Sequence, residues 1–361
     1  MTQPQFKGPL HEMAETTPTE FWNDSCAVDE LRHAIENGAV GATSNPIIVG
    51  EVLKKELAEW AGPIKRIIAT MPSATEDEIT WKLIEEISAR GAKLLEPIHS
   101  ASGGRRGRLS VQTDPRCYRD AARMIQQAVR FDELAPNIIV KIPVTAAGVE
   151  AIEEATFRGI SINATVSFSV PQAMAVAEAV ERGMKRREAG GLETGHMGPV
   201  CTLMVGRLDD WLKQVVRRDD LVIDPAHLEW AGVAVMKKAY RLYQERGYRT
   251  RLLSAATRNH MHWSEFIGGN VVVTLTHSWQ KRFNRSAIAV MPRMNTPVDD
   301  RIVQSLQTHF EEFRRAYDPE GMGAKDFDAF GATRRTLRSF IEGYHELVAM
   351  IRDFMIEDPD R

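Results

Sequence analysis

The chain alternates short, nearly continuous apolar runs with longer stretches in which apolar residues recur every three or four positions. The short runs are rich in β-branched residues and favour buried strands, whereas the longer period is typical of amphipathic helices. Strands are predicted at eight places along the chain: residues 21–24, 39–46, 109–113, 137–145, 160–168, 200–205, 251–256 and 271–275. Helical patterns lie between these strands, and two more, at 298–317 and 333–356, follow the eighth.

This order of elements indicates an α/β protein. Eight strands separated by helices fit a (β/α)₈ TIM barrel with additional helices at the C-terminus better than a doubly wound sheet. The length of 361 residues would permit two domains, but no second dinucleotide-type unit stands out. We therefore expect a single barrel domain over residues 1–361, with an irregular, proline-containing lead-in at 1–20 and the C-terminal helices at 298–361.

Composition and charge narrow the range of partners. The chain is 43% hydrophobic and 26% charged, which is ordinary for a soluble globular protein. A net charge of −3 gives no overall field that would attract nucleic acid or an anionic membrane. The three cysteines (Cys26, Cys117 and Cys201) are too few and too scattered for a disulfide framework or a zinc site. No run resembles a signal sequence or a membrane span, so we expect a cytoplasmic protein without nucleic-acid or membrane partners.

Two segments suggest ligands only weakly. The basic segment 102–108, Ser-Gly-Gly-Arg-Arg-Gly-Arg, could be an RNA-binding tract, but one short copy without aromatic residues favours a solvated loop. His260 and His262 could chelate a metal, although surface or capping histidines are much commoner. Neither a G-x-x-x-x-G-K-[ST] loop nor a G-x-G-x-x-G motif occurs, so nucleotide-dependent chemistry has no support. We expect no metal and no cofactor.

A single lysine, Lys141, interrupts the fourth predicted strand. Burial disfavours the charged form of a lysine, so its position allows two interpretations. In the first, the side chain extends out of the strand end or pairs with a carboxylate. In the second, the amine is held partly neutral inside the barrel and can attack a ketone to form a Schiff base.

The polar residues at the ends of the predicted strands favour the second interpretation. Catalytic groups of such barrels lie at the C-terminal ends of the strands. This layer provides one amine, one carboxylate, several neutral hydrogen-bonding groups and two guanidinium groups: Asp24, Thr43 to Asn45, Gln112, Lys141, Asn163, Thr165, Thr202, Arg207 and Arg258. A Schiff-base aldolase needs such a set, because it requires a nucleophile, an acid–base, hydroxyl-binding groups and a clamp for a terminal anion.

The same residues carry a specific resemblance. The sequence Lys-Ile-Pro-Val-Thr-Ala-Ala-Gly-Val-Glu-Ala-Ile at 141–152 and Gly-Ile-Ser-Ile-Asn-Ala-Thr-Val-Ser-Phe-Ser at 159–169 resemble the two signature motifs of the transaldolase family. Thr-Ser-Asn-Pro at 43–46 is similar to a third motif of that family. Val-Gly-Arg at 205–207 and Ala-Thr-Arg-Asn at 256–259 resemble its two arginine sites. The motifs follow one another in the family's order from about residue 20 to about residue 280.

The resemblance implies a role for each residue. Lys141 would form the Schiff base, and Asp24 would act as the acid–base at the C4 hydroxyl during carbon–carbon cleavage. Thr165 would position the water of carbinolamine dehydration, a step in which Gln112 would also take part. Arg207 and Arg258 would bind the sugar phosphate, and the remaining substrate-binding residues would be Asn45, Thr43, Asn163 and Thr202. The implied activity is that of a transaldolase, which moves a dihydroxyacetone unit between phosphorylated sugars in the pentose phosphate pathway.

Two departures from the family pattern keep alternatives open. Gln112 stands where the family carries a glutamate, and the related fructose-6-phosphate aldolases also have glutamine there. Met204 ends the sequence Thr202-Leu203-Met204, where many transaldolases have Ser-Pro-Phe. The alternatives are a Schiff-base aldolase, a transaldolase for another anionic sugar, or a barrel that binds sugar phosphates without catalysis. We expect a monomer or small homo-oligomer.

Overall fold

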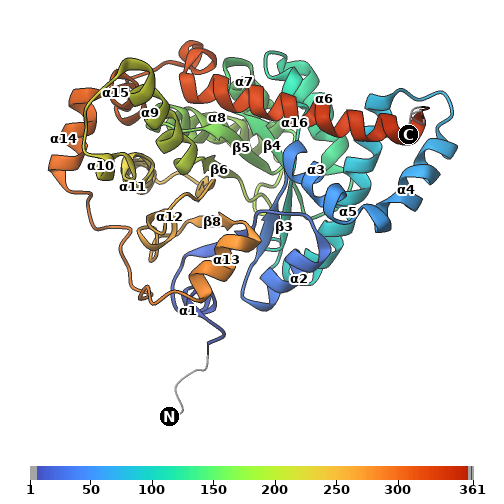
Figure 1. Cartoon of the computed structure of the whole chain (residues 1–361), viewed down its shortest axis with the longest axis horizontal. Coiled ribbons are helices and arrows are strands. Elements are labelled where there is room, and N and C mark those ends of the chain that lie inside the picture. Colours follow the sequence, from blue (N-terminus) through green and yellow to red (C-terminus); the bar gives the residue numbers. More distant parts are fainter. Residues whose placement is uncertain (1–5, 357–358, 360–361) are drawn as a thin grey trace.

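The computed structural model describes residues 6–356 and residue 359, and in them eight parallel strands close into a barrel (Figure 1). Neighbours in the barrel are neighbours in sequence, and the first strand pairs with the last. The strands are β1 (Glu20–Asn23), β2 (Gly41–Thr43), β3 (Arg108–Gln112), β4 (Ile138–Pro143), β5 (Ile162–Ser167), β6 (Val200–Leu203), β7 (Arg251–Ser254) and β8 (Val272–Leu275). The predicted TIM barrel is confirmed, and each strand lies within its predicted range or one residue beyond it.

Helices surround the barrel and extend beyond it (Figure 1). The described residues form α1 (Pro9–Thr16), α2 (Val28–Glu36), α3 (Pro46–Lys55), α4 (Leu57–Thr70), α5 (Glu76–Ala101), α6 (Ala121–Asp132), α7 (Ala146–Phe157), α8 (Val170–Ala189), α9 (Val205–Asp219), α10 (Pro225–Leu228), α11 (Ala231–Arg246), α12 (Met261–Ser264), α13 (His277–Asn284), α14 (Asp300–His309), α15 (Glu311–Tyr317) and α16 (Gly331–Met355), with 3₁₀ turns η1 (Pro115–Cys117) and η2 (Ala324–Ala329). Within the described ranges, none of these helices is long and apolar enough to cross a membrane.

The structure corrects three details of the predicted elements. The lead-in expected to be irregular contains helix α1, which starts at Pro9, a residue whose fixed φ suits the first turn of a helix. The single helix predicted at 298–317 is two helices, because Phe310 between them has an extended backbone (φ −125°, ψ 114°) and a fully buried ring. The helices expected at 48–60 and 64–69 divide instead at Glu56, and Pro63 lies inside α4.

Strand β4 is buried along its whole length, including Lys141. Helices cover the outer face of the strand, so the continuous apolar pattern of Ile138 to Ile142 matches an environment without water on either side. In the register of the sheet, Lys141 lies beside Gln112 of β3 and Asn163 of β5. The barrel therefore places three of the predicted site residues side by side.

Two strand ends near these residues have an unusual backbone. Val166, which follows Thr165 in β5, has φ of +55°, and the register of β5 with β6 shifts between Ala164 and Ser167. Ala256, just after β7, has φ of +63°. Positive φ is disfavoured for side chains with a Cβ, most of all β-branched ones, and such strain concentrates at functional sites.

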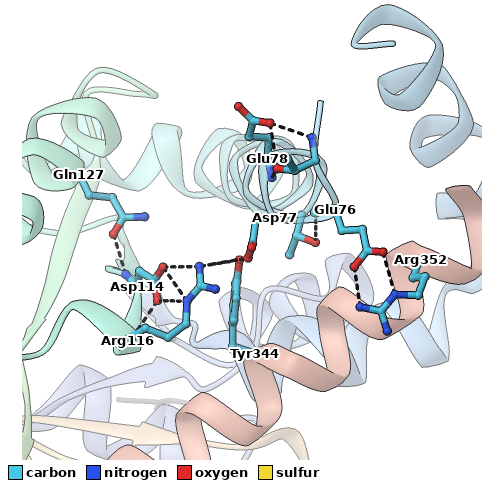
Figure 2. Close-up of polar contacts among 10 residues, drawn as sticks. Glu76, Asp77, Glu78, Asp114, Arg116, Gln127, Tyr344 and Arg352 are labelled. Atoms are coloured by element: carbon cyan, nitrogen blue, oxygen red, sulfur yellow. Dashed lines mark hydrogen bonds and ion pairs between the residues drawn. The ribbon is translucent and has the colours of Figure 1, made fainter. Parts of the chain in front are cut away.

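Helix α16 contacts α3 and α5, which lie between β2 and β3, and α9, which follows β6 (Figure 1). It packs closely on α3, where a Cβ at Gly343 would collide with the side chain of Ile47. Polar contacts fix its other half (Figure 2): Arg352 forms an ion pair with Glu76 at the start of α5. The ring of Tyr344 is covered by the Arg116 guanidinium at 4.4 Å, and its hydroxyl donates to Asp77.

The partners of α16 are themselves held in place. Arg116 forms a bidentate pair with Asp114, whose backbone N–H donates to Gln127 of α6 (Figure 2). The network thus joins α16 to α5, to η1 and to α6. As a result, α16 is a fixed wall along the C-terminal ends of the strands, where the candidate site lies.

Candidate active site

A cavity of about 300 Å³ opens at the C-terminal ends of the strands. Eight of the ten residues predicted for the site line it: Asp24, Thr43, Asn45, Lys141, Thr165, Thr202, Arg207 and Arg258. Gln112 and Asn163 are buried next to it but are not part of its wall. Residues from at least six strand ends therefore meet where the fold was expected to bring them together.

Lys141 lines this cavity and is almost completely buried, with only 5% of the residue exposed. Its Nζ donates a hydrogen bond to the backbone oxygen of Ser44 at 3.2 Å. Burial lowers the pKa of Lys141 to about 8, and the positive charge of Arg207 acts in the same direction, whereas Asp24 opposes it. A substantial fraction of the amine is therefore neutral near physiological pH and can act as a nucleophile.

Asp24 follows β1 and is oriented by hydroxyl groups. Its Oδ1 accepts a hydrogen bond from Thr43 Oγ1 at 2.6 Å. Thr43 has one hydroxyl proton and gives it to Asp24, so the contact at 2.8 Å between the hydroxyls of Thr43 and Thr274 has Thr274 as the donor. The chain of hydroxyls holds one oxygen of the carboxylate, and the other oxygen has no side-chain hydrogen-bond partner among the described residues.

Asn45 combines a structural and a potential binding role. Its Oδ1 accepts from the Ile48 N–H at 3.1 Å and so caps helix α3. Its side-chain NH₂ group has no hydrogen-bond partner among the described residues, and the residue lines the cavity. The cap fixes the amide, and the free donors face the place where substrate hydroxyls would lie.

Asn163 lies one layer below the cavity. Its Nδ2 donates to Ser110 Oγ, and its Oδ1 accepts from Thr202 Oγ1, each at 2.7 Å. This pairing links β3, β5 and β6 and fixes the hydroxyl of Thr202, which does line the cavity. The predicted contact of Asn163 with substrate would therefore pass through Thr202.

Two buried oxygen atoms on either side of Lys141 lack partners. Neither Gln112 Oε1 nor Thr165 Oγ1 has a hydrogen bond to any described residue. Buried polar atoms are normally paired, so unpaired ones at a functional site have a role that the resting protein does not satisfy. Both atoms belong to the strands that flank the one carrying the amine.

The two arginines of the site differ in what they contact. The guanidinium of Arg207 lies 5.2 Å from the ring of Phe340 in α16 and makes no ion pair or side-chain hydrogen bond with any described residue. Burial, reinforced by repulsion from Arg258, lowers the pKa of Arg207 to about 10, so it stays protonated at neutral pH. Arg258 instead pairs with Asp210, with Nε at 2.9 Å from Oδ2. The free cation is therefore Arg207.

Several functional neighbours escaped sequence reasoning. Asp210, Thr274 and Trp279 belong to the site but stand in no motif that predicts them. His262, expected at the surface or in a cap, is fully buried, which corrects the first alternative. Its Nδ1 accepts from the Arg258 backbone N–H at 3.1 Å, so its Nε2 carries the proton and donates to Asp209 at 2.8 Å.

The His262–Asp209 pair thereby fixes the backbone that carries Arg258. The second oxygen of Asp209 accepts from the Gly232 N–H at 2.8 Å, so the carboxylate is held from two sides. Within the part of the chain that the structure describes, no group of three or more His, Cys, Asp or Glu side chains could hold a metal ion. The pair is therefore a scaffold for the anion-binding side of the cavity.

Comparison with known proteins agrees with this geometry. A transaldolase from Mycobacterium ulcerans is 31% identical over 242 residues, covering 62% of this chain and 61% of the relative. Transaldolase 1 of Streptomyces avermitilis is 31% identical over 214 residues (57% and 54%), and transaldolase 1 of Streptomyces coelicolor is 30% identical over 255 residues (66% and 62%). The chain thus spans between 54% and 62% of the length of these curated relatives.

A sequence model of a whole family covers more of the chain than these pairwise matches. Residues 21–346 match the model of the family described as Transaldolase/Fructose-6-phosphate aldolase. That range runs from β1 into α16 and includes every residue of the cavity wall. The chain therefore belongs to the Transaldolase/Fructose-6-phosphate aldolase family.

Proposed function

We propose that this protein is a transaldolase, which transfers a dihydroxyacetone unit from a ketose phosphate to an aldose phosphate through a Schiff base on Lys141. The observation that carries the proposal is an amine buried in the cavity, with a pKa of about 8, beside one carboxylate and an unpaired guanidinium. A lysine that served only as a structural cation would gain from a carboxylate partner, and Lys141 forms no ion pair with any described residue.

The first chemical step uses the neutral amine. Lys141 Nζ attacks the ketone carbon of the donor, and the carbonyl oxygen takes a proton to give a carbinolamine. Loss of water then leaves an imine, which is protonated and withdraws electrons from the neighbouring carbons. We assign the holding of this water to Thr165 Oγ1 and Gln112 Oε1, because both oxygens are buried near the amine and lack other partners.

The second step breaks the carbon–carbon bond. Asp24 removes the proton of the C4 hydroxyl, the C3–C4 bond breaks, and its electron pair moves into the protonated imine to form an enamine. The aldehyde fragment leaves, and an acceptor aldehyde takes its place. The enamine then attacks the acceptor carbonyl, which recovers the proton from Asp24. The hydrogen bond from Thr43 keeps the carboxylate in one orientation for both proton transfers.

The phosphate of the sugar would bind at the arginine side of the cavity. Arg207 offers unpaired donors, and Arg258 already shares its charge with Asp210. A phosphate would therefore bind first to Arg207 and share Arg258 with that carboxylate. The substrates are thus phosphorylated sugars, the cellular setting is cytoplasmic carbohydrate metabolism of the pentose phosphate type, and the assembly is a monomer or small homo-oligomer.

The alternative is a Schiff-base aldolase that releases free dihydroxyacetone. Gln112 favours this alternative, since an amide can hold a water molecule but cannot exchange a proton with it. Product analysis with fructose 6-phosphate, in the presence and absence of erythrose 4-phosphate, separates the two activities. Turnover that depends on the acceptor supports the transaldolase, whereas release of dihydroxyacetone without an acceptor supports the aldolase.

Borohydride trapping tests the covalent step itself. We expect reduction in the presence of fructose 6-phosphate to leave a stable adduct on the peptide that contains Lys141. A Lys141→Met variant serves as the matched control and should show no adduct. If the wild-type protein forms no adduct on any lysine, the protein is a non-catalytic sugar-phosphate-binding barrel.

A further inference from the structure

A second and larger cavity lies at the opposite end of the barrel. It has a volume of about 880 Å³, and its wall includes residues at or next to the first residues of β1, β2, β3, β6, β7 and β8. We call it the N-terminal cavity, with walls formed mainly by Trp22, Ile98, Arg105, Arg108, Met197 and Arg251. Nothing in the proposed reaction uses it. Its volume lies in the range of small-molecule sites.

The wall of the N-terminal cavity carries an excess of positive charge. Five arginines line it, at positions 105, 106, 108, 249 and 251, together with a single carboxylate, that of Glu20. Glu20 pairs with both Arg106 and Arg251, at 2.6 and 2.8 Å. Arg249 pairs with Glu181 and Glu188, which lie outside the wall. Arg105 and Arg108 remain without a carboxylate partner among the described residues.

Arg108 is the central observation, because its side chain is buried and forms no ion pair with any described residue; the carboxylate of Asp132 acts on its charge only from beyond ion-pair distance. The residue is 4% exposed, and its guanidinium donates only to neutral oxygens: Ser161 Oγ at 3.1 Å, Gly104 O at 2.7 Å and His196 O at 2.6 Å. A buried cation normally has a carboxylate or another anion beside it. Arg108 lines the N-terminal cavity.

Hydrogen-bond donors are also in excess over acceptors around this cavity. Among the described residues, the Nε groups of Arg108 and Arg251 and the indole Nε1 of Trp22 are buried and have no acceptor. Unpaired buried donors are rare, and three of them behind one wall add to the excess of positive charge over acceptors on this side of the barrel. An anion with several oxygens would offset this excess.

The basic segment 102–108, interpreted from sequence as a solvated loop, forms one rim of the cavity. It folds back on the end of α5: Gly107 has φ of +73°, and a Cβ there would collide with the backbone of His99. This turn directs Arg108 into the barrel and leaves Arg105 exposed at the rim without a partner among the described residues. The expectation of a fully solvated loop is therefore wrong for Arg108.

The rest of the wall is apolar. Ile98 and Met197, which are partly exposed, contribute apolar surface suited to a ring or another flat apolar group. Guanidinium groups match phosphate oxygens in geometry and remain charged at all physiological pH values. The wall thus combines an anion-binding side with a surface for an organic moiety.

We propose that the N-terminal cavity binds an organic phosphate of nucleotide size, with its phosphates at Arg105 and Arg108 and its organic part on Ile98 and Met197. The site is separate from the catalytic cavity, so the proposal does not depend on the proposed function. Strand β3 connects the two ends, since it starts at Arg108 and finishes at Gln112 beside the catalytic lysine.

Isothermal titration calorimetry with ADP as the probe tests the site. We expect the full-length protein to bind ADP and to bind adenosine or inorganic pyrophosphate at least about tenfold more weakly, since each lacks half of the recognised features. Arg105→Ser should weaken ADP binding about tenfold without affecting the fold, because Arg105 is exposed. Arg285→Ser removes an exposed arginine outside the cavity and should bind like the wild type.

Further variants make the outcome decisive. Arg108→Gln should also weaken binding, with the melting temperature measured to show that the protein is folded. Arg207→Ala, in the catalytic cavity, should leave ADP binding unchanged. The proposal is overturned if ADP does not bind at millimolar concentration, if Arg105→Ser binds like the wild type, or if Arg207→Ala abolishes binding. Pyrophosphate binding as tight as that of ADP, or a single-stranded RNA oligonucleotide binding more tightly, would also overturn it.

Discussion

At each end of the barrel lies one cation that is almost completely buried, and the two cations differ in what their head groups can do. Lys141 at the C-terminal end is 5% exposed, and Arg108 at the N-terminal end is 4% exposed. Neither forms an ion pair with a carboxylate of the described chain, and both donate to neutral oxygens. The burial and the pairing of the two side chains are thus almost the same.

The difference lies in the head groups. Burial lowers the pKa of the Lys141 ammonium to about 8, so the group can lose its proton and attack carbon. A guanidinium keeps its proton under the same burial, so Arg108 can only attract an anion. The comparison teaches that, for a buried cation without an ion pair, the acidity of the head group decides whether it can act as a nucleophile or only attract an anion.

The largest effect on turnover is expected when Lys141 is replaced by arginine, the residue type that is buried at the N-terminal end. Lys141→Arg should lower turnover by roughly 10⁴-fold or more, because a permanently protonated guanidinium cannot form an imine. Steady-state assays with fructose 6-phosphate and an aldose phosphate measure this loss. Lys65→Arg, an exchange at an exposed position, is the control and should be fully active. Substantial activity in Lys141→Arg would disprove the Schiff-base mechanism.

Asp24→Asn should reduce carbon–carbon cleavage by about 10²- to 10⁴-fold, the contribution typical of a positioned acid–base. The amine is untouched, so borohydride should still trap an adduct on Lys141. Rapid-quench measurement of cleavage, together with mass spectrometry of the trapped protein, separates the two steps. Cleavage at a near wild-type rate would leave Asp24 with only its structural contact to Thr43.

Imine formation should depend on pH, because Lys141, unlike Arg108, can lose its proton near neutral pH. The neutral amine reacts, so the trapping rate should rise with pH and level off above the pKa of about 8. Between about pH 6 and pH 8 the neutral fraction grows from roughly 1% to one half, which predicts an increase of about fifty-fold. A rate that stays constant over this range would contradict a buried, partly neutral lysine.

The two catalytic-end arginines should differ in effect because only one is free. Arg207→Ala should raise the KM for phosphorylated sugars by about 10- to 100-fold while changing reactions of free dihydroxyacetone little. Arg258→Ala should have a smaller effect, about 3- to 10-fold, since Arg258 already shares its charge with Asp210. Equal changes for charged and uncharged substrates would exclude a phosphate clamp.

The smallest expected effect is at Gln112. Gln112→Glu places a proton-exchanging group beside Lys141 in the register of the sheet, and should shift partition from dihydroxyacetone release to transfer by a few-fold. The exchange is nearly isosteric, so packing stays the same. The ratio of the two products in the presence of an acceptor measures the shift. An unchanged ratio would show that Gln112 does not set the type of reaction.

The fold could be predicted because its strands have a local pattern that matches their surroundings. The β-branched runs around Lys141 and Val272 are buried on both faces, so composition alone identifies them. The break at Phe310 could not be predicted in this way. A buried ring with an extended backbone is set by tertiary packing, and nothing in the local sequence stops the helical period there.

Site residues that lie in or directly after strands could be predicted from the sequence. Contacts between residues that are distant in sequence could not. Asp24 and Asn45 follow strands, Lys141 lies within one, and Lys141 and Asn45 stand in family motifs. The pairing of Arg258 with Asp210 and the burial of His262 depend on how α9 packs near the turn after β7. The N-terminal cavity was missed for the same reason, since its wall combines strand starts distant in sequence with a loop that looks solvated.

The position of α16 in the chain has a consequence for the protein during its synthesis. Phe340, which contacts the catalytic Arg207, is made 65 residues after Leu275, the last residue of β8. At typical rates of about 5–20 residues per second, the ribosome completes all eight strands about 3–13 s before it adds this wall. Residues 20–275, which form the eight strands, are therefore synthesised before the helix whose Phe340 ring lies against Arg207, and this contact is among the last that translation allows.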